Sequence, residues 1–106
     1  MDRFNYKDCT ECFIKMGRYP NENLRLDIFG KKNNDVVYVA EVTKEVPRKL
    51  REVEVVVDVY GDDTIFDMLQ NMNLVKYRES YILKDRAFPI GYLNFGRIQQ
   101  YLQKAS

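Results

Sequence analysis

The chain has 106 residues, with 17 Lys and Arg against 16 Asp and Glu, two Cys, no Trp and no His. At this length we expect a single domain over residues 1–106, which can bury a core without a disulfide or a metal ion. No stretch approaches the roughly 18 continuous apolar residues of a membrane-spanning helix. Because His is the usual general base and the commonest metal ligand, its absence argues against most hydrolase mechanisms.

The first strand is predicted after Glu11, where Cys12, Ile14 and Met16 share one face of a two-residue alternation. Residues 1–10 precede this pattern and mix charged with aromatic side chains, so a flexible start to the domain is left open. No uninterrupted apolar stretch follows them, and we therefore expect a cytoplasmic protein without a secretory signal.

Turn residues divide the next part of the sequence into a three-stranded meander. Residues 18–23 contain Pro and Asn at positions typical of a tight connection, and residues 24–28 resume the apolar alternation. A second turn is predicted over residues 30–35. Residues 36–42 are rich in β-branched side chains and are predicted to form the third strand.

A polar loop and a valine-rich strand follow the meander. Residues 44–52 are polar and contain Pro47, so we predict a loop. Residues 53–60 hold the densest run of valines in the chain, and these valines would cover both faces of a strand. We therefore predict that this strand lies centrally in the sheet.

The C-terminal half combines two short helices with further strands. Asp62 or Asp63 is the expected N-cap of a helix with apolar residues at helical spacing, and these are Ile65, Phe66, Leu69 and Met72. Residues 74–93 are strand-like, and Asn94 is the expected cap of a last short helix. The predicted fold class is α+β: one antiparallel sheet of five to six strands, with a central helix and a short C-terminal helix packed on it.

The Cys9-x-x-Cys12 motif permits three interpretations. A zinc site needs about four ligands, so Asp8 and Glu11, or cysteines pooled from two chains, would have to complete it. A redox disulfide normally opens a helix that follows a strand, whereas this pair precedes the first predicted strand. We favour two unconnected thiols, with Cys12 facing the core, and we expect no cofactor.

Acidic residues gather near the predicted junction between the valine strand and the helix, at Asp58, Asp62, Asp63 and Asp67. Oxygen ligands of this kind can hold Mg²⁺. Helix capping and the attraction of the helix dipole for negative charge in the first turn explain the same positions more simply. We therefore expect neither a metal site nor a catalytic residue here.

Charge is divided unevenly along the chain. Residues 1–67 carry 11 basic and 14 acidic side chains, whereas residues 68–106 carry six basic and two acidic ones. In this second part cations alternate with aromatic residues, a mixture that can neutralise phosphates and stack bases. The simpler interpretation is a half-exposed sheet with aromatic side chains inside and charges outside.

Two groups of residues are therefore candidates for partner binding. The first lies on the predicted loop and comprises Lys44, Arg48, Lys49 and Arg51. The second lies in the basic and aromatic C-terminal part and comprises Lys76, Arg78, Tyr81, Lys84, Arg86, Tyr92 and Arg97.

Several short motifs resemble a small family of unknown function from bacterial mobile elements and phages. They are Gly17-Arg18-Tyr19, Leu24-x-Leu26, Val57-Asp58, Met68-Leu69 and Phe88-Pro89-Ile90-Gly91-Tyr92. The resemblance covers most of the chain and implies an accessory protein of a mobile element. It carries no catalytic residues over to this sequence.

The leading hypothesis is a non-enzymatic protein that binds another protein stoichiometrically. By analogy with inhibitors of host defence, its partner would be a bacterial effector nuclease of the CRISPR or restriction type, bound by a sheet face or by residues 44–52. The alternative is a nucleic-acid-binding module that uses the basic and aromatic strands. A homodimer formed through a sheet edge is a third option, and no membrane partner is expected.

Overall fold

The computed structural model describes residues 2–102, and the strands there form two antiparallel sheets instead of the single sheet predicted. Sheet 1 contains, in spatial order, β1 (Phe4–Tyr6), β2 (Cys9–Arg18), β3 (Leu24–Lys32) and β4 (Asp35–Glu41). Sheet 2 contains β5 (Glu54–Val56), β7 (Arg86–Leu93) and β6 (Val75–Leu83), with β7 in the middle.

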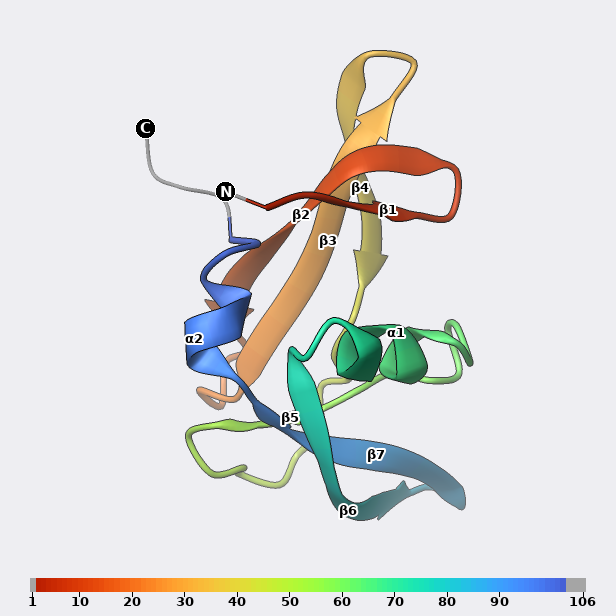
Figure 1. Ribbon diagram of the computed structural model, residues 1–106. Coiled ribbons are helices and arrows are strands. Elements are labelled where there is room, and N and C mark those ends of the chain that lie inside the picture. Colours follow the sequence, from red (N-terminus) through yellow and green to blue (C-terminus); the bar gives the residue numbers. More distant parts are fainter. Residues whose placement is uncertain (1, 103–106) are drawn as a thin grey trace.

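Two short helices accompany the sheets. Figure 1 shows α1 (Ile65–Asn71) between the two sheets and α2 (Phe95–Ile98) beside sheet 1. The radius of gyration of 13.4 Å is close to the value of about 13 Å expected for one domain of 100 residues. The α+β class and the single compact domain are therefore confirmed. No helix of the described residues is long and apolar enough to cross a membrane.

The predicted meander is confirmed as β2, β3 and β4. Two-residue turns close the β3–β4 and β6–β7 hairpins, and both central residues of each turn have positive φ, as type I′ turns require. These residues are Asn33 (53°) and Asn34 (69°) in the first turn, and Lys84 (49°) and Asp85 (66°) in the second. Asn tolerates this conformation, whereas Lys does so at a cost, so the second turn is strained.

β1 was not predicted, and it forms because β2 is bulged. The register of β2 shifts between Thr10 and Phe13, and Glu11 has a φ of 49° there. In a regular strand residues three apart point to opposite faces, but the bulge turns both Cys9 and Cys12 into the core. The prediction that Cys12 faces the core is confirmed.

The prediction of a central valine strand was wrong, because β5 is an edge strand of only three residues. Its valines are buried by two separate clusters. Val55 and Val57 belong to the main core between the sheets and α1, whereas Val56 packs in a second cluster with Phe88 and Ile90 of β7. The apolar run therefore reflects burial on both sides of the chain. At the end of β5 it also hydrogen-bonds to the segment after β4, where Lys44 N donates to Val56 O at 2.8 Å and Asp58 N donates to Val42 O at 2.9 Å.

The helix caps match the prediction only in part. Neither Asp62 nor Asp63 is the N-cap of α1, a position taken by Thr64. Asp62 instead accepts hydrogen bonds from the backbone N–H (2.9 Å) and hydroxyl (2.7 Å) of Thr64, which shapes the turn before the helix. Asp67 lies in the first turn of α1, and Asn94 caps α2 by accepting from Arg97 N at 3.1 Å, both as predicted.

Substitution of Gly30 by Ala should destabilise the fold. An added Cβ would lie 2.6 Å from Cys12 Sγ and 3.1 Å from Cys9 Cβ, so we expect the free energy of unfolding to fall by about 1–3 kcal/mol. The double variant Gly30→Ala/Cys12→Ala removes the opposing sulfur. It should therefore recover part of the unfolding free energy that the clash costs, as measured by urea unfolding.

Gly17→Ala is the matched control on the neighbouring strand. Its Cβ would meet nothing within 4 Å, so the free energy of unfolding should stay the same or rise by up to about 1 kcal/mol. Equal stability of Gly30→Ala and the wild type would contradict the close packing of β3 on the bulge.

Candidate functional site

A groove forms where the loop after β4 meets the β6–β7 hairpin. Its volume is about 600 Å³, and it is lined by Lys44, Glu45, Pro47, Leu83, Lys84, Arg86 and Phe88. We call these seven residues the basic groove. Two basic segments that are separated by about 40 residues in the sequence thus share one surface.

Side chains from the β2–β3 turn hold the loop of the basic groove in place. Asn21 Nδ2 donates to Val46 O at 2.8 Å, and Asn23 Nδ2 donates to Arg48 O at 2.8 Å. Asn23 Oδ1 also accepts from Leu50 N at 2.9 Å. Asn23 is only 4% exposed, so its amide satisfies loop backbone groups that water cannot reach.

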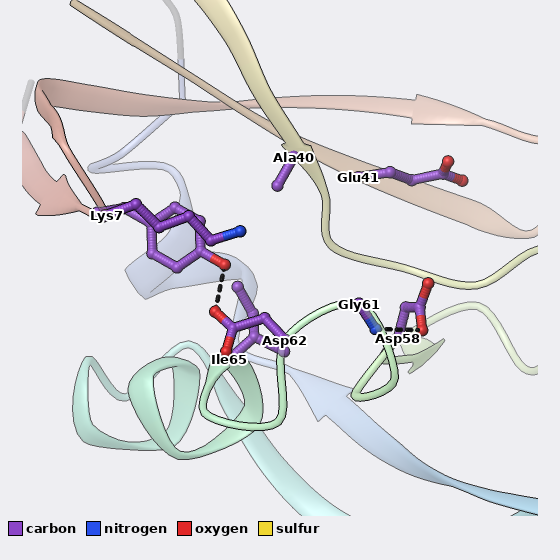
Figure 2. A pocket seen from close by; sticks show the side chains of 8 residues that line it. Lys7, Ala40, Glu41, Asp58, Gly61, Asp62 and Ile65 are labelled. Atoms are coloured by element: carbon purple, nitrogen blue, oxygen red, sulfur yellow. Dashed lines mark hydrogen bonds between the residues drawn. The ribbon is translucent and has the colours of Figure 1, made fainter.

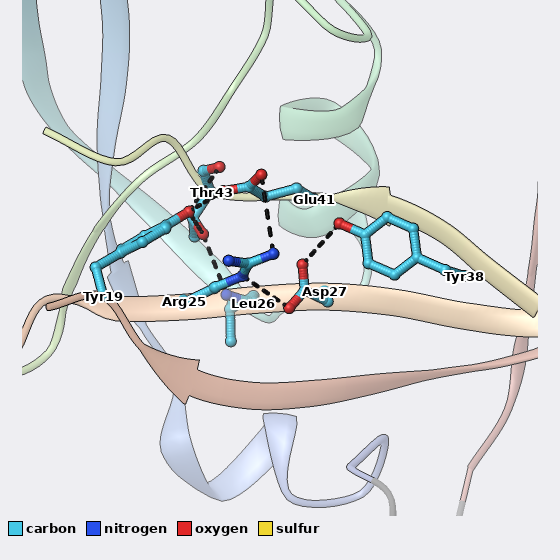
Figure 3. A network of polar contacts seen from close by, with 7 residues as sticks. All are labelled: Tyr19, Arg25, Leu26, Asp27, Tyr38, Glu41 and Thr43. Atoms are coloured by element: carbon cyan, nitrogen blue, oxygen red, sulfur yellow. Dashed lines mark hydrogen bonds and ion pairs between the residues drawn. The ribbon is translucent and has the colours of Figure 1, made fainter.

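A polar network fixes the start of the same loop at Thr43 (Figure 3). The Tyr19 hydroxyl donates to Glu41 and lies 2.9 Å from Thr43 Oγ1, while Leu26 N donates to Thr43 Oγ1 at 3.1 Å. Burial, together with the carboxylate of Glu41, raises the pKa of Tyr19 well above its ordinary value. The tyrosine therefore stays neutral and remains a hydrogen-bond donor.

The floor of the basic groove is apolar and its rim is positively charged. Phe88 is 3% exposed and belongs to the second hydrophobic cluster, and Leu83 packs against that cluster. Lys44, Lys84 and Arg86 are exposed on the rim, and none of the three pairs with a carboxylate of the described residues. Their charges are thus available to an anionic partner.

Aromatic rings orient two arginines close to the basic groove. The Arg86 guanidinium lies 4.9 Å from the ring centroid of Tyr60, whose ring meets Phe88 edge to face. The Tyr60 hydroxyl accepts from Ala87 N at 3.1 Å, which ties the ring to the hairpin. Arg48 lies 5.9 Å from the ring centroid of Tyr81 in the same way. Cation–π contacts of this kind hold the arginine side chains without neutralising them.

Other predicted binding residues lie away from the basic groove. Arg78 forms an ion pair with Glu54, which is 2% exposed, and donates to the Tyr92 hydroxyl at 2.7 Å. Arg97 donates to Met72 O at 3.2 Å and contacts Tyr101. These contacts join elements of the fold to one another, so Arg78, Tyr92 and Arg97 have structural roles.

The remaining predicted cations are exposed but separate. Lys49 and Arg51 line a smaller cavity of about 210 Å³ together with residues of the β2–β3 turn. Lys76 is exposed on β6, opposite Tyr92 of β7, and does not line the basic groove.

Two of the acidic residues near α1, Asp58 and Asp62, line a cavity of about 250 Å³ between sheet 1 and the turn before α1 (Figure 2). The Tyr6 hydroxyl donates to Asp62 at 2.5 Å, and this bond lowers the pKa of the Asp62 carboxyl. Asp58 accepts from Tyr60 N and Gly61 N and closes a turn instead of lying on a strand as predicted. Within residues 2–102 no group of three His, Cys, Asp or Glu is placed to hold a metal ion.

The two cysteines are free thiols inside the core. Cys9 is 4% exposed and Cys12 is fully buried. Burial raises the pKa of both thiols, which disfavours the reactive thiolate. Their environment is that of small apolar core residues.

Comparison with known proteins adds no relative: no family model, no curated protein and no solved structure matches the chain.

The groove floor and the residues that hold its loop are not evident from the sequence. The pattern alone predicts ordinary strand residues at Leu83 and Phe88 and turn residues at Asn21 and Asn23. We call the hydrogen bonds from Asn21 and Asn23 to the loop the clasp. Its one signal in the sequence is a pair of Asn residues two positions apart, in a chain that also contains a long polar loop. Asn side chains can satisfy backbone groups of a second segment as well as their own turn.

Asn23→Ala should destabilise the protein and loosen the basic groove. It removes two hydrogen bonds and leaves the backbone N–H of Leu50 buried without a partner, which should cost about 2 kcal/mol. Urea unfolding measures the loss, and amide hydrogen exchange at residues 46–50 should accelerate. Asn71→Ala, on the exposed end of α1, should change stability by less than about 0.5 kcal/mol. Unchanged exchange in Asn23→Ala would contradict the clasp.

The bond between Tyr6 and Asp62 should make stability depend on pH. The pKa of Asp62 is lowered in the folded state, so its stabilisation is present above the ordinary Asp pKa of about 3.9 and disappears as pH falls through the folded pKa. Burial and Asp62 raise the pKa of Tyr6 in the folded state. The stabilisation of the fold by the neutral Tyr6 hydroxyl is therefore lost progressively above the ordinary Tyr pKa of about 10.

Tyr6→Phe should therefore cost about 1 kcal/mol at neutral pH and progressively less below pH 4. Urea unfolding over a pH series measures the difference from the wild type. Tyr77→Phe is the control, because the Tyr77 hydroxyl contacts only the Ser80 hydroxyl and should show no such acid dependence. A pH-independent difference for Tyr6→Phe would rule out the charged bond.

Proposed function

We propose that this chain is a non-enzymatic binding protein that holds a protein partner in the basic groove at a fixed stoichiometry. One observation carries the proposal: three cations that form no ion pair within residues 2–102 surround an apolar floor that lies between a held loop and a hairpin tip. Such a surface suits an acidic segment that also supplies an apolar side chain.

A protein partner accounts for the groove better than an extended polyanion. The floor of Leu83 and Phe88 offers apolar contact that a phosphate backbone cannot use. Glu45 lies on the same rim, and Asp85 is next to Lys84 in the turn, so a continuous line of phosphates would also meet carboxylates. By analogy with inhibitors of host defence, an accessory protein of a mobile element would bind a bacterial effector nuclease, which we propose as the partner.

The strained turn at Lys84 supports a binding role for that residue. A φ of 49° is unfavourable for Lys and favourable for Gly. The type I′ turn imposes this conformation, and Gly would adopt it at lower cost, so we infer that the charge of Lys84 serves binding. Lys84 places a charge on the groove rim, which Gly would not do.

Charge changes in the basic groove should weaken partner binding without unfolding the protein. The tagged chain is incubated with nuclease-treated extract of its native host, and the recovered partner is then titrated by calorimetry. Lys44→Glu and Arg86→Glu should each weaken binding by at least about tenfold, because each leaves a carboxylate where the partner presents its own. Lys84→Gly should weaken binding while keeping or raising the free energy of unfolding.

Lys76→Glu is the matched control: it makes the same charge change on the same hairpin, outside the groove. It should bind within about twofold of the wild type. Recovery of the bait alone at every salt concentration would contradict the proposal. A partner lost after nuclease treatment would assign the groove to nucleic acid instead.

A further inference from the structure

A second surface, on sheet 1, carries a row of aromatic rings outside both hydrophobic cores. Phe13 of β2 is the register partner of Phe29 of β3, and Phe29 is in turn the partner of Tyr38 of β4. The three rings therefore lie side by side on one face of adjacent strands. We call them the aromatic row.

The aromatic row faces away from the interior. The residues beside it in the strands, Cys12, Ile14 and Ile28, are fully buried in the main core, so the row belongs to the opposite face. Phe13 and Phe29 stack with centroids 5.8 Å apart and planes 14° apart, and Tyr38 meets Phe29 edge to face at 5.3 Å. Tyr38 is 51% exposed and Phe29 is half-buried, whereas Phe13 is only 7% exposed and supports Phe29 from below the surface.

Two cations lie over these rings without carboxylate partners. The Arg3 guanidinium is 4.8 Å from the Phe13 centroid, and Lys15 Nζ is 4.6 Å from the Phe29 centroid. Neither pairs with an acidic group of residues 2–102. Both are exposed, so they can swing off the rings toward an incoming anion.

Further along the same face the charges are already paired. Arg25 lies 3.0 Å from Asp27 and 4.0 Å from Glu41 (Figure 3), and Lys31 lies 3.1 Å from Glu11. Asp27 also accepts from the Tyr38 hydroxyl at 3.0 Å, so the unpaired positive charge lies at the Phe13 and Phe29 end of the aromatic row. Cross-strand aromatic pairs also stabilise a sheet. A purely structural role of this kind would not require a half-exposed ring, nor unpaired cations that lie over the rings.

We propose that the aromatic row binds about two nucleotides of single-stranded nucleic acid, with the bases on Phe29 and Tyr38. Flat rings stack unpaired bases without regard to sequence, and Arg3 and Lys15 would take the adjacent phosphates. Because the site has only these two cations, stacking supplies more of the affinity than phosphate contacts do. This explains how a chain of nearly balanced charge can carry such a site. The proposal is independent of the basic groove, which lies on the other sheet.

Fluorescence anisotropy with labelled oligo(dT) and oligo(U) tests the proposal and separates DNA from RNA. Binding should weaken with salt at a slope of about −1.4 in log K against log salt, as expected for two phosphates on a single strand. Tyr38→Ala and Phe29→Leu should each weaken binding by about fivefold or more. Phe29→Tyr keeps a ring and should bind within about twofold of the wild type.

Two further variants test whether Arg3 and Lys15 each contact a phosphate. Arg3→Gln and Lys15→Gln should each flatten the salt slope by about 0.7. The groove variant Lys84→Gly should bind the oligonucleotides like the wild type, and Tyr38→Ala should keep the partner of the basic groove, so the two proposals can fail separately. Urea unfolding of each variant confirms that the fold is retained.

Several results would overturn the proposal. The first is no anisotropy change at about 20 mM salt. The second is an equal affinity for the wild type, Tyr38→Ala and Phe29→Leu, and the third is loss of binding in Lys84→Gly. The fourth is complete displacement of the oligonucleotide by oligoglutamate, which would make the row an acidic-peptide site.

Discussion

The amide of Asn23 holds the loop that joins the two sheets, in addition to the backbone hydrogen bonds between residues 42–44 and residues 56–58. Sheet 1 ends at Glu41 and sheet 2 begins at Glu54, and the loop between them has little regular structure of its own. Asn23 holds this loop by bonds to Arg48 and Leu50, so that the side chain of Leu50 reaches the second hydrophobic cluster. Without this clasp the loop would have to satisfy buried backbone groups in some other way. One polar side chain thus joins the packing of sheet 2 to a turn of sheet 1.

Much of the fold follows from local sequence patterns. The alternation at residues 24–28, the turn at Asn33 and Asn34, and the cap at Asn94 each act over a few residues, and each was predicted correctly. The valine run was misplaced because its burial comes from two clusters assembled from distant segments. β1 was missed because its pairing depends on a bulge at Glu11, a residue type that does not ordinarily adopt positive φ. The position of the valine run and the formation of β1 thus both depend on contacts between segments that are distant in the sequence.

The candidate site was predictable in its charges but not in its geometry. Composition identified Lys44, Lys84 and Arg86, yet only the folded chain brings the first beside the other two. The same composition could not distinguish them from Arg78, whose charge is used to hold buried Glu54. The aromatic row was hidden for a related reason: Phe13 and Phe29 alternate with core residues, and a strand pattern alone does not show that their outer face lacks a covering element. Cross-strand register supplies that information.

The open edge of β4 bears on self-association. If two copies paired antiparallel through β4 with Tyr38 opposite Tyr38, Asp35 of each copy would face Glu41 of the other. Like charges directly across a strand pair are destabilising, and here the repulsion would act at both ends of the pairing. In this register the like charges at both ends of the pairing disfavour extension of the sheet from one molecule to the next along the edge that exposes Val36 and Tyr38.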